Sequence, residues 1–485
     1  MPTSGILAGV RAGVIPEELR IAICAGPSSN REDSVSHRAV SLCLAFLCLF
    51  LCITAARSQQ AKLDGLLDRD MPSLLSTYKA LHAAPELSHH EEKTSAFVAG
   101  QLRTLGYTVT ERIGKYAGHP ERVGYGVVGV LKNGDGPTVY VRTELDALPI
   151  EEQTGLPYAS KVRAKDEAGR EVGVMHACGH DIHITSFLGT AKMLVELRDQ
   201  WRGTLVMLAQ PAEEGGNGAL AMLDDGLYAR FPQPDYVLAL HDSPALEAGK
   251  VGYTPGYSMA SSTSVDVIIR GVGGHGSQPQ VAKDPIVEAA QFILAIQTIV
   301  SREDSPFDPA VVTVGSIHGG TRGNIIPDEV HLQLTIRTYK EEVRQHILAA
   351  LDRMAKGIAA ADGIPASRAP TVTASADAYP ALYNDPQLTL RLAAVFKKAL
   401  GPENVEEGQP IMASEDFGRF GLENHQIPIC QFSLGAVDPA RLAESHRTGV
   451  PLPGLHSSLW APVPEPTLRT GVKSMTSAVL DLMKK

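Results

Sequence analysis

Three short apolar runs with helical stretches between them stand out in the first half of the sequence. They extend from Thr138 to Leu145, from Thr204 to Ala209 and from Tyr236 to Leu240, and most of their residues are β-branched or aliphatic. Strands buried on both faces of a parallel sheet have this composition, and helices usually form the crossovers between them. The pattern predicts an α/β fold in which a mixed or parallel sheet is flanked by helices.

The clearest helical stretch between these runs follows Asp181, a residue type that often caps helix N-termini. The apolar residues that recur there at helical spacing are Ile184, Phe187, Leu188, Ala191, Leu194 and Val195. Two more helices are expected before the first run, over Met71 to His82 and over Glu91 to Leu105. Helices and buried strands therefore alternate along this part of the chain, as in α/β proteins.

The periodicity changes near residue 255, where apolar and polar residues begin to alternate one by one. Val265, Val267 and Ile269 have polar neighbours, and the same alternation runs from Val330 to Ile336. Antiparallel strands with one solvent-facing side have this pattern. The other elements of the block are expected at Pro285 to Val300 (helix), Ala310 to Ile317 (strand) and Glu341 to Ala361 (helix). We interpret the block as an inserted α+β unit with an antiparallel sheet and two helices.

The first pattern returns after Pro370, which indicates that the alternating block interrupts a single domain. A helix over Gln387 to Leu400, a strand over Pro428 to Leu434 and a helix over Arg469 to Met483 are expected there. We therefore predict an N-terminal extension with a signal peptide over residues 1–58 and a first part of the interrupted domain over residues 62–254. The inserted unit over residues 255–366 and the second part of the interrupted domain over residues 367–485 would follow.

An uncharged apolar run covers residues 39–56, with a basic residue before it and a polar stretch after it. This is the layout of a secretory signal, and its strongly apolar core is short for a membrane span. The sequence thus predicts a periplasmic or secreted protein without stable membrane insertion after signal cleavage, with a retained membrane anchor as the minor alternative. The true start codon and the cleavage site stay open. Four of the six cysteines precede residue 58, so the mature chain keeps only Cys178 and Cys430 and shows no disulfide framework.

The charge balance argues against a nucleic-acid partner. The chain has 44 Lys and Arg against 54 Asp and Glu, which gives a net charge of -10. No basic stripe is present in the sequence to neutralise a phosphate backbone. We therefore expect no nucleic-acid partner.

Side chains that can bind metal ions gather where the predicted buried strands end. They are Glu144 and Asp146, Cys178 with His180 and Asp181, Glu213 and Glu214, and His241 with Asp242. Ligand sites of open α/β sheets form outside the carboxyl ends of the strands, so these groups are expected to converge. Each one alone has a structural alternative as a helix cap or as buried filler. Together, thiolate, imidazole and carboxylate groups suit Zn²⁺ or a similar divalent ion, and a thiolate can bridge two ions.

The adjacent carboxylates of Glu213 and Glu214 predict two separate roles. Neighbouring side chains project in different directions, so one carboxylate can bind metal while the other stays free. A free carboxylate near the site can accept a proton from an attacking water and pass it to a leaving amine. Gly215 and Gly216 would let the backbone approach this site closely.

Seven short motifs follow one another along the chain. They are LHAAPELS at 81–88, DALP at 146–149, MHACGHD at 175–181, PAEEG at 211–215, GGHG at 273–276, GNIIPD at 323–328 and SEDF at 414–417. In order and spacing they resemble those of the M20 metallopeptidase superfamily, in the branch that contains hippurate hydrolase and indole-acetyl-amino-acid hydrolases. The similarity extends over roughly residues 70–480. One departure is Glu144, which stands where this branch commonly has Asp.

The resemblance implies a centre with two divalent metal ions per subunit, of Zn, Mn or Co. The family's metal ligands fall on Cys178, His180, Glu214, His241 and His456. Glu213 takes the place of the catalytic base that activates the attacking water. Asp146 takes the place of a carboxylate that orients a ligand imidazole from behind.

The resemblance also implies that residues 62–254 and 367–485 form the catalytic domain. Residues 255–366 would then be a lid or dimerisation domain, with a four-stranded antiparallel sheet and two helices, that carries substrate-binding residues. His275 would polarise the scissile carbonyl, and its position between glycines leaves a simple turn as the lesser alternative. Asn324 and Arg337 would bind the substrate, and a guanidinium can hold a carboxylate through two hydrogen bonds. His176 and His183 are expected to be structural, and Ser414 to Asp416 are expected either near the metal ligands or at a helix cap. His82, His89 and His90 are expected at the surface or at caps.

The sequence therefore predicts a metal-dependent amidohydrolase that hydrolyses the amide bond of N-acyl amino acids, such as hippurate, to the free acid and the amino acid. A dipeptidase or carboxypeptidase of the same superfamily is one alternative, and a non-catalytic acyl-amino-acid binding protein is another. A homodimer through the lid domain is left open. The acyl group, the amino acid, the metal and the oligomeric state are not determined at this level.

Overall fold

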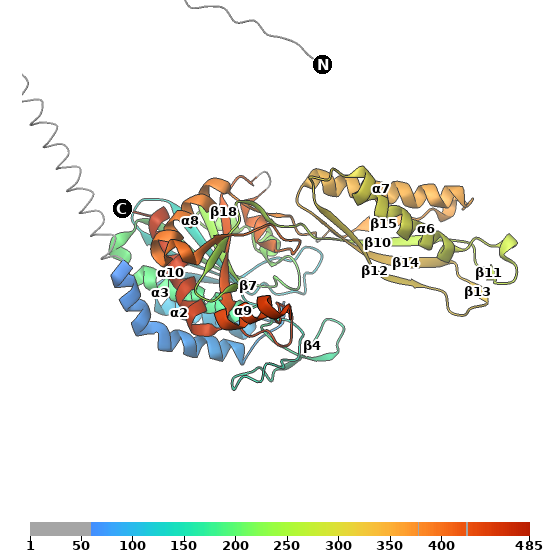
Figure 1. The fold of residues 1–485 in the computed structure, drawn as a ribbon. Coiled ribbons are helices and arrows are strands. Elements are labelled where there is room, and N and C mark those ends of the chain that lie inside the picture. Colours follow the sequence, from blue (N-terminus) through green and yellow to red (C-terminus); the bar gives the residue numbers. More distant parts are fainter. Residues whose placement is uncertain (1–59, 377, 423–424) are drawn as a thin grey trace, which may run out of the picture. The chain divides into compact units, whose positions relative to one another are not determined.

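The computed structural model describes residues 60–376, 378–422 and 425–485 (Figure 1). The predicted N-terminal extension and signal peptide, residues 1–58, lie outside the described residues, so export stays a prediction. Within the described ranges, no helix is both long and apolar enough to cross a membrane.

An eight-stranded mixed sheet has the strand order β1-β2-β6-β3-β7-β18-β8-β17. Its strands are β1 (Thr108–Ile113), β2 (Gly126–Asn133), β3 (Thr138–Glu144), β6 (Gly203–Gln210), β7 (Tyr236–Glu247), β8 (Val251–Tyr253), β17 (Val405–Glu407) and β18 (Ile429–Val437). The four neighbours β6, β3, β7 and β18 are parallel, whereas β1 and β2 extend one edge in antiparallel fashion. The three apolar runs and the later strand are thus neighbours at the centre of one sheet, which confirms the predicted α/β class.

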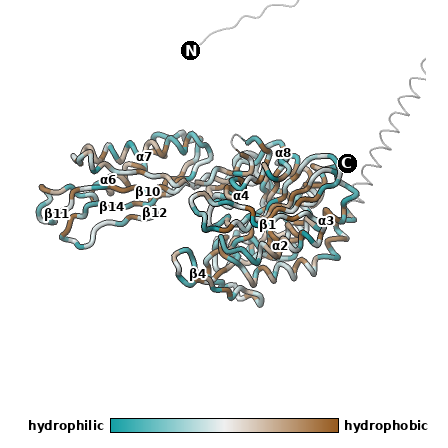
Figure 2. The backbone as a smooth tube through the Cα atoms, turned by 180° about the vertical axis from the view of Figure 1, so that it is seen from behind, coloured by the Kyte–Doolittle hydropathy of each residue, from teal (hydrophilic) through white to brown (hydrophobic). Residues whose placement is uncertain are grey.

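Both faces of this sheet are buried, which explains why its central strands lack polar alternation. Val139 and Val141 of β3 pack into one hydrophobic cluster, whereas Tyr140 between them packs into another on the opposite face. Figure 2 shows the hydrophobic residues gathered along the strands in this region. The first face is covered by a helix over residues 60–82 and by α2 (Glu92–Thr104), α3 (His180–Glu196), α8 (Pro386–Leu400) and α10 (Pro464–Leu482). The second face is covered by α4 (Gly218–Asp224), α5 (Leu227–Arg230) and η6 (Asp416–Gly421).

A separate four-stranded antiparallel sheet, in the order β12-β14-β10-β15, forms the inserted unit. Its strands are β10 (Thr263–Arg270), β12 (Ala310–Gly319), β14 (Glu329–Thr338) and β15 (Thr371–Ala374). The inward residues of β10 and β14 pack with the helices α6 (Pro285–Thr298) and α7 (Glu341–Ala361) in a cluster of their own. This core explains the strict alternation in the sequence, because only one face of the sheet is covered. The domain boundaries predicted from the sequence stay a prediction.

The strand register shows which end of the inserted unit connects to the domain with the eight-stranded sheet. Thr263 of β10 pairs with Ile336, and Arg270 at the other end of β10 pairs with Glu329. The chain passes between this domain and the inserted unit at the first end. There the backbone N–H of Ser261 donates a hydrogen bond to the Thr338 carbonyl. The short strands β11 (Gly274–His275) and β13 (Ile325–Ile326) follow the second end, as Figure 1 shows. We call this hairpin-like pair the tip.

Three local details differ from the sequence prediction. The helix expected over Met71 to His82 covers residues 60–82. Gly179 rather than Asp181 caps helix α3, because the chain turns there with a φ of 75°, which glycine adopts without strain. Strand β7 continues to Glu247, so His241 and Asp242 lie within the strand rather than after it. Elements that the sequence patterns did not reveal include β4 (Arg163–Lys165), β5 (Glu171–Gly173), β9 (Gly256–Met259), β16 (Leu382–Asn384), α9 (Pro439–Thr448), the inner strand β2 and the edge strands β1 and β15.

Candidate metal centre and active site

Five side chains from four separate segments of the chain converge on one point. The sulfur of Cys178 lies 3.6 Å from Nε2 of His241 and 3.3 Å from Nε2 of His456. Oε1 of Glu214 lies 3.2 Å from Nε2 of His456 and 3.9 Å from Nε2 of His180. The structure thus brings together all five residues that the resemblance assigned to metal binding.

The Cys178 sulfur belongs to two groups of side chains that could each hold an ion. One group consists of Cys178, His180 and His241, and the other consists of Cys178, Glu214 and His456. In each group the ligand atoms lie within 4.8 Å of one another. A shared sulfur is the arrangement that a thiolate bridging two ions requires.

The ring nitrogens of two histidines are oriented by backbone carbonyls. Nδ1 of His180 lies 2.8 Å from the carbonyl oxygen of Asp146, and Nδ1 of His241 lies 2.8 Å from that of Asp242. A carbonyl only accepts, so each Nδ1–H donates and leaves the Nε2 lone pair facing the cluster. Metal-binding histidines are commonly held in this tautomer by such a contact.

Two buried polar atoms in the cluster form no hydrogen bond of good geometry, although Oε1 of Glu214 lies near the His456 ring, and they test whether metal ions fit here. Nε2 of His180 and Oε1 of Glu214 are buried without a hydrogen bond to any described residue. Burying such atoms without partners is costly, and a bound cation would satisfy both of them. Burial and the neighbouring carboxylates of Glu214 and Glu213 also raise the pKa of the Cys178 thiol well above its ordinary value. A divalent ion removes that proton from a coordinating thiol, so the donor set and the burial fit a metal centre.

The local backbone explains why glycine follows Cys178. A Cβ atom on Gly179 would lie 2.2 Å from Oδ2 of Asp242, and the residue has a left-handed φ. Glycine alone therefore allows Cys178 and His180 to turn towards the same point. His456 also has a positive φ, of 63°, and its backbone N–H donates to the Ala177 carbonyl over 2.8 Å. This bond ties the C-terminal loop to the Cys178 loop.

Asp146 joins three segments behind the cluster. Its Oδ2 accepts hydrogen bonds from the Ser88 hydroxyl, at 2.6 Å, and from the backbone N–H of Glu214, at 2.9 Å. Its Oδ1 lies 3.5 Å from Nδ1 of His180. Asp146 therefore orients His180 through its backbone carbonyl, and its fully buried carboxylate holds the Glu214 loop through the backbone of that loop.

Glu213 lies beside the five candidate ligands and has its carboxylate free. The side chain is 7% exposed, and one carboxylate oxygen lies within 4.8 Å of the ligand atoms of His180 and Glu214. The carboxylate forms no hydrogen bond with the described residues, whereas the Glu213 carbonyl accepts from the Tyr379 hydroxyl. Burial, followed by the negative charges of Glu415 and Glu214, raises the pKa of Glu213 well above its ordinary value. These are properties of a proton acceptor placed next to a reaction centre.

A buried cation stands behind these acidic residues. The fully buried Arg142 guanidinium contacts Glu144, lies 2.8 Å from Oε1 of Glu415 and lies 3.0 Å from Oδ1 of Asp416. Glu415 also accepts from the backbone N–H of Phe417 and so caps η6. The SEDF motif therefore serves both as a helix cap and as part of the charge network, two roles that the sequence could not separate. Glu144 contacts both the Arg142 guanidinium and Nδ1 of His183.

Comparison with known proteins places the chain in a family. The model of peptidase family M20/M25/M40 matches residues 140–456. The chain belongs to the M20 peptidase family. It is 40% identical to hippurate hydrolase of Campylobacter jejuni, over 70% of this chain and 82% of the relative. It is 36% identical to thermostable carboxypeptidase 1 of Saccharolobus solfataricus, over 75% of this chain and 85% of the relative.

A solved structure supports the same assignment. The Bacillus subtilis YXEP protein, described as a dinuclear metal binding peptidase from the M20 family, superposes with a TM-score of 0.67 at 26% sequence identity. The alignment covers 86% of this chain and 99% of that protein. The chain therefore has the M20 fold and belongs to a family of hydrolases that act on amide or peptide bonds. The dinuclear metal site of a family member fits the cluster described above.

Three further histidines of this M20 chain surround the centre without a place among the five candidate ligands. His183 lies between Glu144 and Asp242, and His176 is buried without a hydrogen-bond partner among the described residues. His82 was expected at the surface but is 1% exposed, because its ring lies between Asp181, at 2.6 Å, and Glu152, at 3.0 Å. Burial opposes the charged ring, yet the hydrogen bond and charge of Asp181 raise the pKa of His82 to about 9.

The lid residues named by the resemblance lie in two places. His275 and Asn324 lie at the tip, where the Gly276 N–H donates to the Asn324 carbonyl and the Ser277 hydroxyl lies 2.7 Å from Nδ1 of His275. Within the described residues neither one contacts the five candidate ligands. Arg337 lies near the crossing end of β14 and donates to the Ser414 hydroxyl over 2.8 Å, directly before the Arg142 network. Sequence motifs identified these residues, but only the strand register shows how far apart the tip and Arg337 are.

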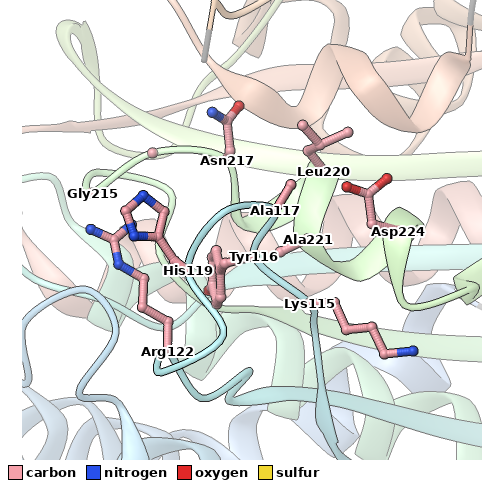
Figure 3. Close-up of a pocket in the computed structure, with 11 residues that line it drawn as sticks. Lys115, Tyr116, Ala117, His119, Arg122, Gly215, Asn217, Leu220, Ala221 and Asp224 are labelled. Carbon is pink, nitrogen blue, oxygen red and sulfur yellow. The ribbon is translucent and has the colours of Figure 1, made fainter. Parts of the chain in front are cut away.

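A pocket of about 80 Å³ adjoins the loop after Glu214 and was not expected from the sequence (Figure 3). Figure 3 shows His119 and Arg122 near Gly215, with Lys115 on the side of Asp224. The two cations and His119 each face an acidic side chain: Lys115 faces Asp225, Arg122 faces Glu167 and His119 faces Glu121. The pocket therefore has no unbalanced positive charge for an anionic ligand.

Proposed function

We propose that this M20 hydrolase cleaves the amide bond of N-acyl amino acids of the hippurate type and releases the free acid and the amino acid. The observation that carries the proposal is the free, buried Glu213 carboxylate beside five converging metal-type ligands. A binding site for a cation needs the ligands alone, whereas hydrolysis also needs a proton acceptor. Hippurate hydrolase of Campylobacter jejuni, at 40% identity, supports the acyl-amino-acid class.

In this proposal Cys178, His180, Glu214, His241 and His456 hold two divalent ions. Such ions, when bound, polarise the scissile carbonyl and make an attacking water more acidic. Glu213 accepts the proton of the attacking water and then delivers it to the departing amine nitrogen. Asp146 keeps His180 and the Glu214 loop in place throughout.

The proposed substrate contacts come from the inserted unit. Arg337 has a half-buried guanidinium beside Ser414 and is suited to pairing with the substrate carboxylate. His275 would stabilise negative charge on the carbonyl oxygen and Asn324 would hold the substrate. Because both lie at the tip, these two roles require the tip to reach a metal centre, through a lid movement or in a second copy of the chain.

A carboxypeptidase or dipeptidase activity is the second candidate, and the 36% identity to a thermostable carboxypeptidase favours keeping it. The two functions differ in the acyl pocket rather than in the metal cluster. We expect hippurate and other N-acyl amino acids to be turned over at least about tenfold faster, in kcat/KM, than dipeptides and peptide substrates, which corresponds to about 1.4 kcal/mol of transition-state binding. Equal or higher kcat/KM for peptides would reverse this order.

Chelation separates an enzyme from a protein that only captures acylated amino acids. We expect dialysis against a strong chelator to abolish hydrolysis, and added Zn²⁺, Mn²⁺ or Co²⁺ to restore it. Hippurate binding measured by calorimetry before and after chelation serves as the comparison. Binding with no turnover in any metal-loaded form would show a capture protein instead.

We also propose that the inserted unit is a homodimer contact. Three apolar side chains of α6 face solvent, with exposed fractions of 44% for Ile286, 53% for Val287 and 73% for Leu294. Strand β12 is an edge strand, so its outer backbone groups are unpaired among the described residues. A second copy would cover both. Light scattering should give the mass of a dimer for the unaltered protein and that of a monomer for Leu294→Glu, and a monomeric unaltered protein would exclude this contact.

A further inference from the structure

Asp242 contacts several segments of the cluster from behind. Its carboxylate is 2% exposed. Oδ2 accepts a hydrogen bond from the indole Nε1–H of Trp460 over 3.2 Å. Oδ1 lies 3.3 Å from Nε2 of His183, to which the Asp242 backbone N–H donates over 2.8 Å. Oδ1 also lies 3.4 Å from Nδ1 of His241. One buried carboxylate thus joins strand β7, helix α3 and the loop before α10.

The residues that contact the Asp242 carboxylate lie close in sequence to candidate ligands. His241 precedes it directly, and Trp460 follows His456 in the same loop. Gly179, which separates Cys178 from His180, packs so closely against the carboxylate that a Cβ atom there would lie 2.2 Å from Oδ2. Four of the five candidate ligands therefore sit within a few residues of an Asp242 contact, although Asp242 itself is not among the five.

The polar partners of Asp242 are themselves held in place. His183 is clamped between Asp242 and Glu144, whose Oε2 lies 3.1 Å from Nδ1 of His183. Glu144 in turn contacts the Arg142 guanidinium. Trp460 is 3% exposed and packs in an apolar cluster with Met175 and Ala177, next to the Cys178 turn. The carboxylate is therefore held on both sides, and its position determines that of the loops that carry the candidate ligands.

We propose that Asp242 is the positioning residue of the metal centre: it holds the Cys178–His180 turn, His241 and the His456 loop in register and places a fixed negative charge behind the cations. The proposal rests on the metal centre of the proposed function. Groups that orient metal ligands from behind are typically worth about 10- to 100-fold in metal affinity. Asp242 contacts no ligand atom directly, so it acts through the residues that carry them.

The test measures metal affinity in the full mature chain without substrate. Metal-free protein is titrated with Zn²⁺ against a chromogenic chelator, for the unaltered protein and for Asp242→Asn. Asn keeps the size and can still accept from Trp460, but it removes the charge and replaces one acceptor with a donor. We expect about a 10- to 100-fold weaker Zn²⁺ affinity, with the melting temperature of the metal-free protein close to that of the unaltered chain.

A matched control is Asp70→Asn. Asp70 is also buried, at 6% exposure, but its carboxylate pairs with Arg69 and Lys192 and touches none of the candidate ligands. This variant should lose stability while it keeps the Zn²⁺ affinity of the unaltered protein. An equal loss of affinity in both variants would show a general effect of stability and would overturn the positioning role.

A second variant keeps the proposal open to refutation if Asp242→Asn does not fold. Trp460→Phe retains the aromatic packing and removes only the Nε1–H donor to Asp242, so a several-fold loss of Zn²⁺ affinity is expected. Unchanged affinity in whichever of the two variants folds overturns the proposal. The outcome is independent of substrate choice: a protein that binds Zn²⁺ tightly but cleaves no acyl amino acid would refute the proposed function and leave the role of Asp242 standing.

Discussion

Glu213→Gln should lower kcat on an N-acyl amino acid by about 10³- to 10⁴-fold, which is the upper part of the range for the loss of a general acid–base group. Gln has the same shape but cannot accept the proton of the attacking water or return it to the amine. The five candidate ligands are untouched, so the metal content by elemental analysis should match that of the unaltered protein.

The environment of Glu213 also predicts how this substitution affects the stability of the metal-free protein. The pKa of the carboxylate is raised by burial and by its acidic neighbours, so the ionised group is unfavourable in the metal-free fold. Removing its charge should therefore leave the melting temperature of the metal-free protein unchanged or increase it.

Glu214→Gln is the matched comparison, because it alters the adjacent carboxylate that the proposal assigns to metal binding. It should lose metal, whereas Glu213→Gln should not. Turnover near that of the unaltered enzyme in Glu213→Gln would remove Glu213 from the mechanism. Metal loss in both variants would instead place both carboxylates among the ligands.

The largest effect on stability is expected for Arg142→Leu. Arg142 is the cation that faces Glu144, Glu415 and Asp416 in a fully buried network. Removing one partner of a buried ion pair leaves uncompensated charge and typically costs about 3–5 kcal/mol in the free energy of unfolding. Urea unfolding of the metal-free proteins at pH 7 measures this difference.

The loss should also depend on pH, with a definite sign. Arg142 holds the pKa values of Glu144 and Glu415 below their ordinary range, against the effect of burial. Without Arg142, burial raises those pKa values above the unfolded ones, so the carboxylates destabilise the fold more as they ionise. The difference between Arg142→Leu and the unaltered protein should therefore be smaller at pH 5 than at pH 8.

Arg163→Met provides the control for Arg142. Arg163 pairs with Glu151 and Glu171, but its side chain is 49% exposed, and exposed ion pairs contribute about 0–1 kcal/mol. Its loss should change the free energy of unfolding by less than about 1 kcal/mol at either pH. A similarly small effect of Arg142→Leu would mean that the acidic residues of the network are neutral or solvated rather than paired.

Much of the fold could be predicted because local patterns reflect burial. The run from Thr204 to Ala209 is apolar on both faces and is a central parallel strand, whereas Val330 to Ile336 alternates and is a strand with one covered face. The edge strands β1 and β15 were not located, because exposed edges carry mixed residues without strong periodicity. The cap of α3 was assigned to Asp181 because capping preferences are statistical, whereas the close approach of Asp242 requires glycine at position 179.

The sequence by itself determined the fold class, the interruption of one domain by an antiparallel unit, and the residue types able to bind metal, because burial and ligand chemistry leave their mark residue by residue. Spacing alone missed His456, which a motif resemblance supplied, since no local rule links it to Cys178. Only the tertiary structure decided that these side chains meet around a shared sulfur, that Arg142 neutralises the acidic residues behind them and that His275 lies at the tip. Those are contacts between segments far apart in the chain, and packing rather than local pattern determines them.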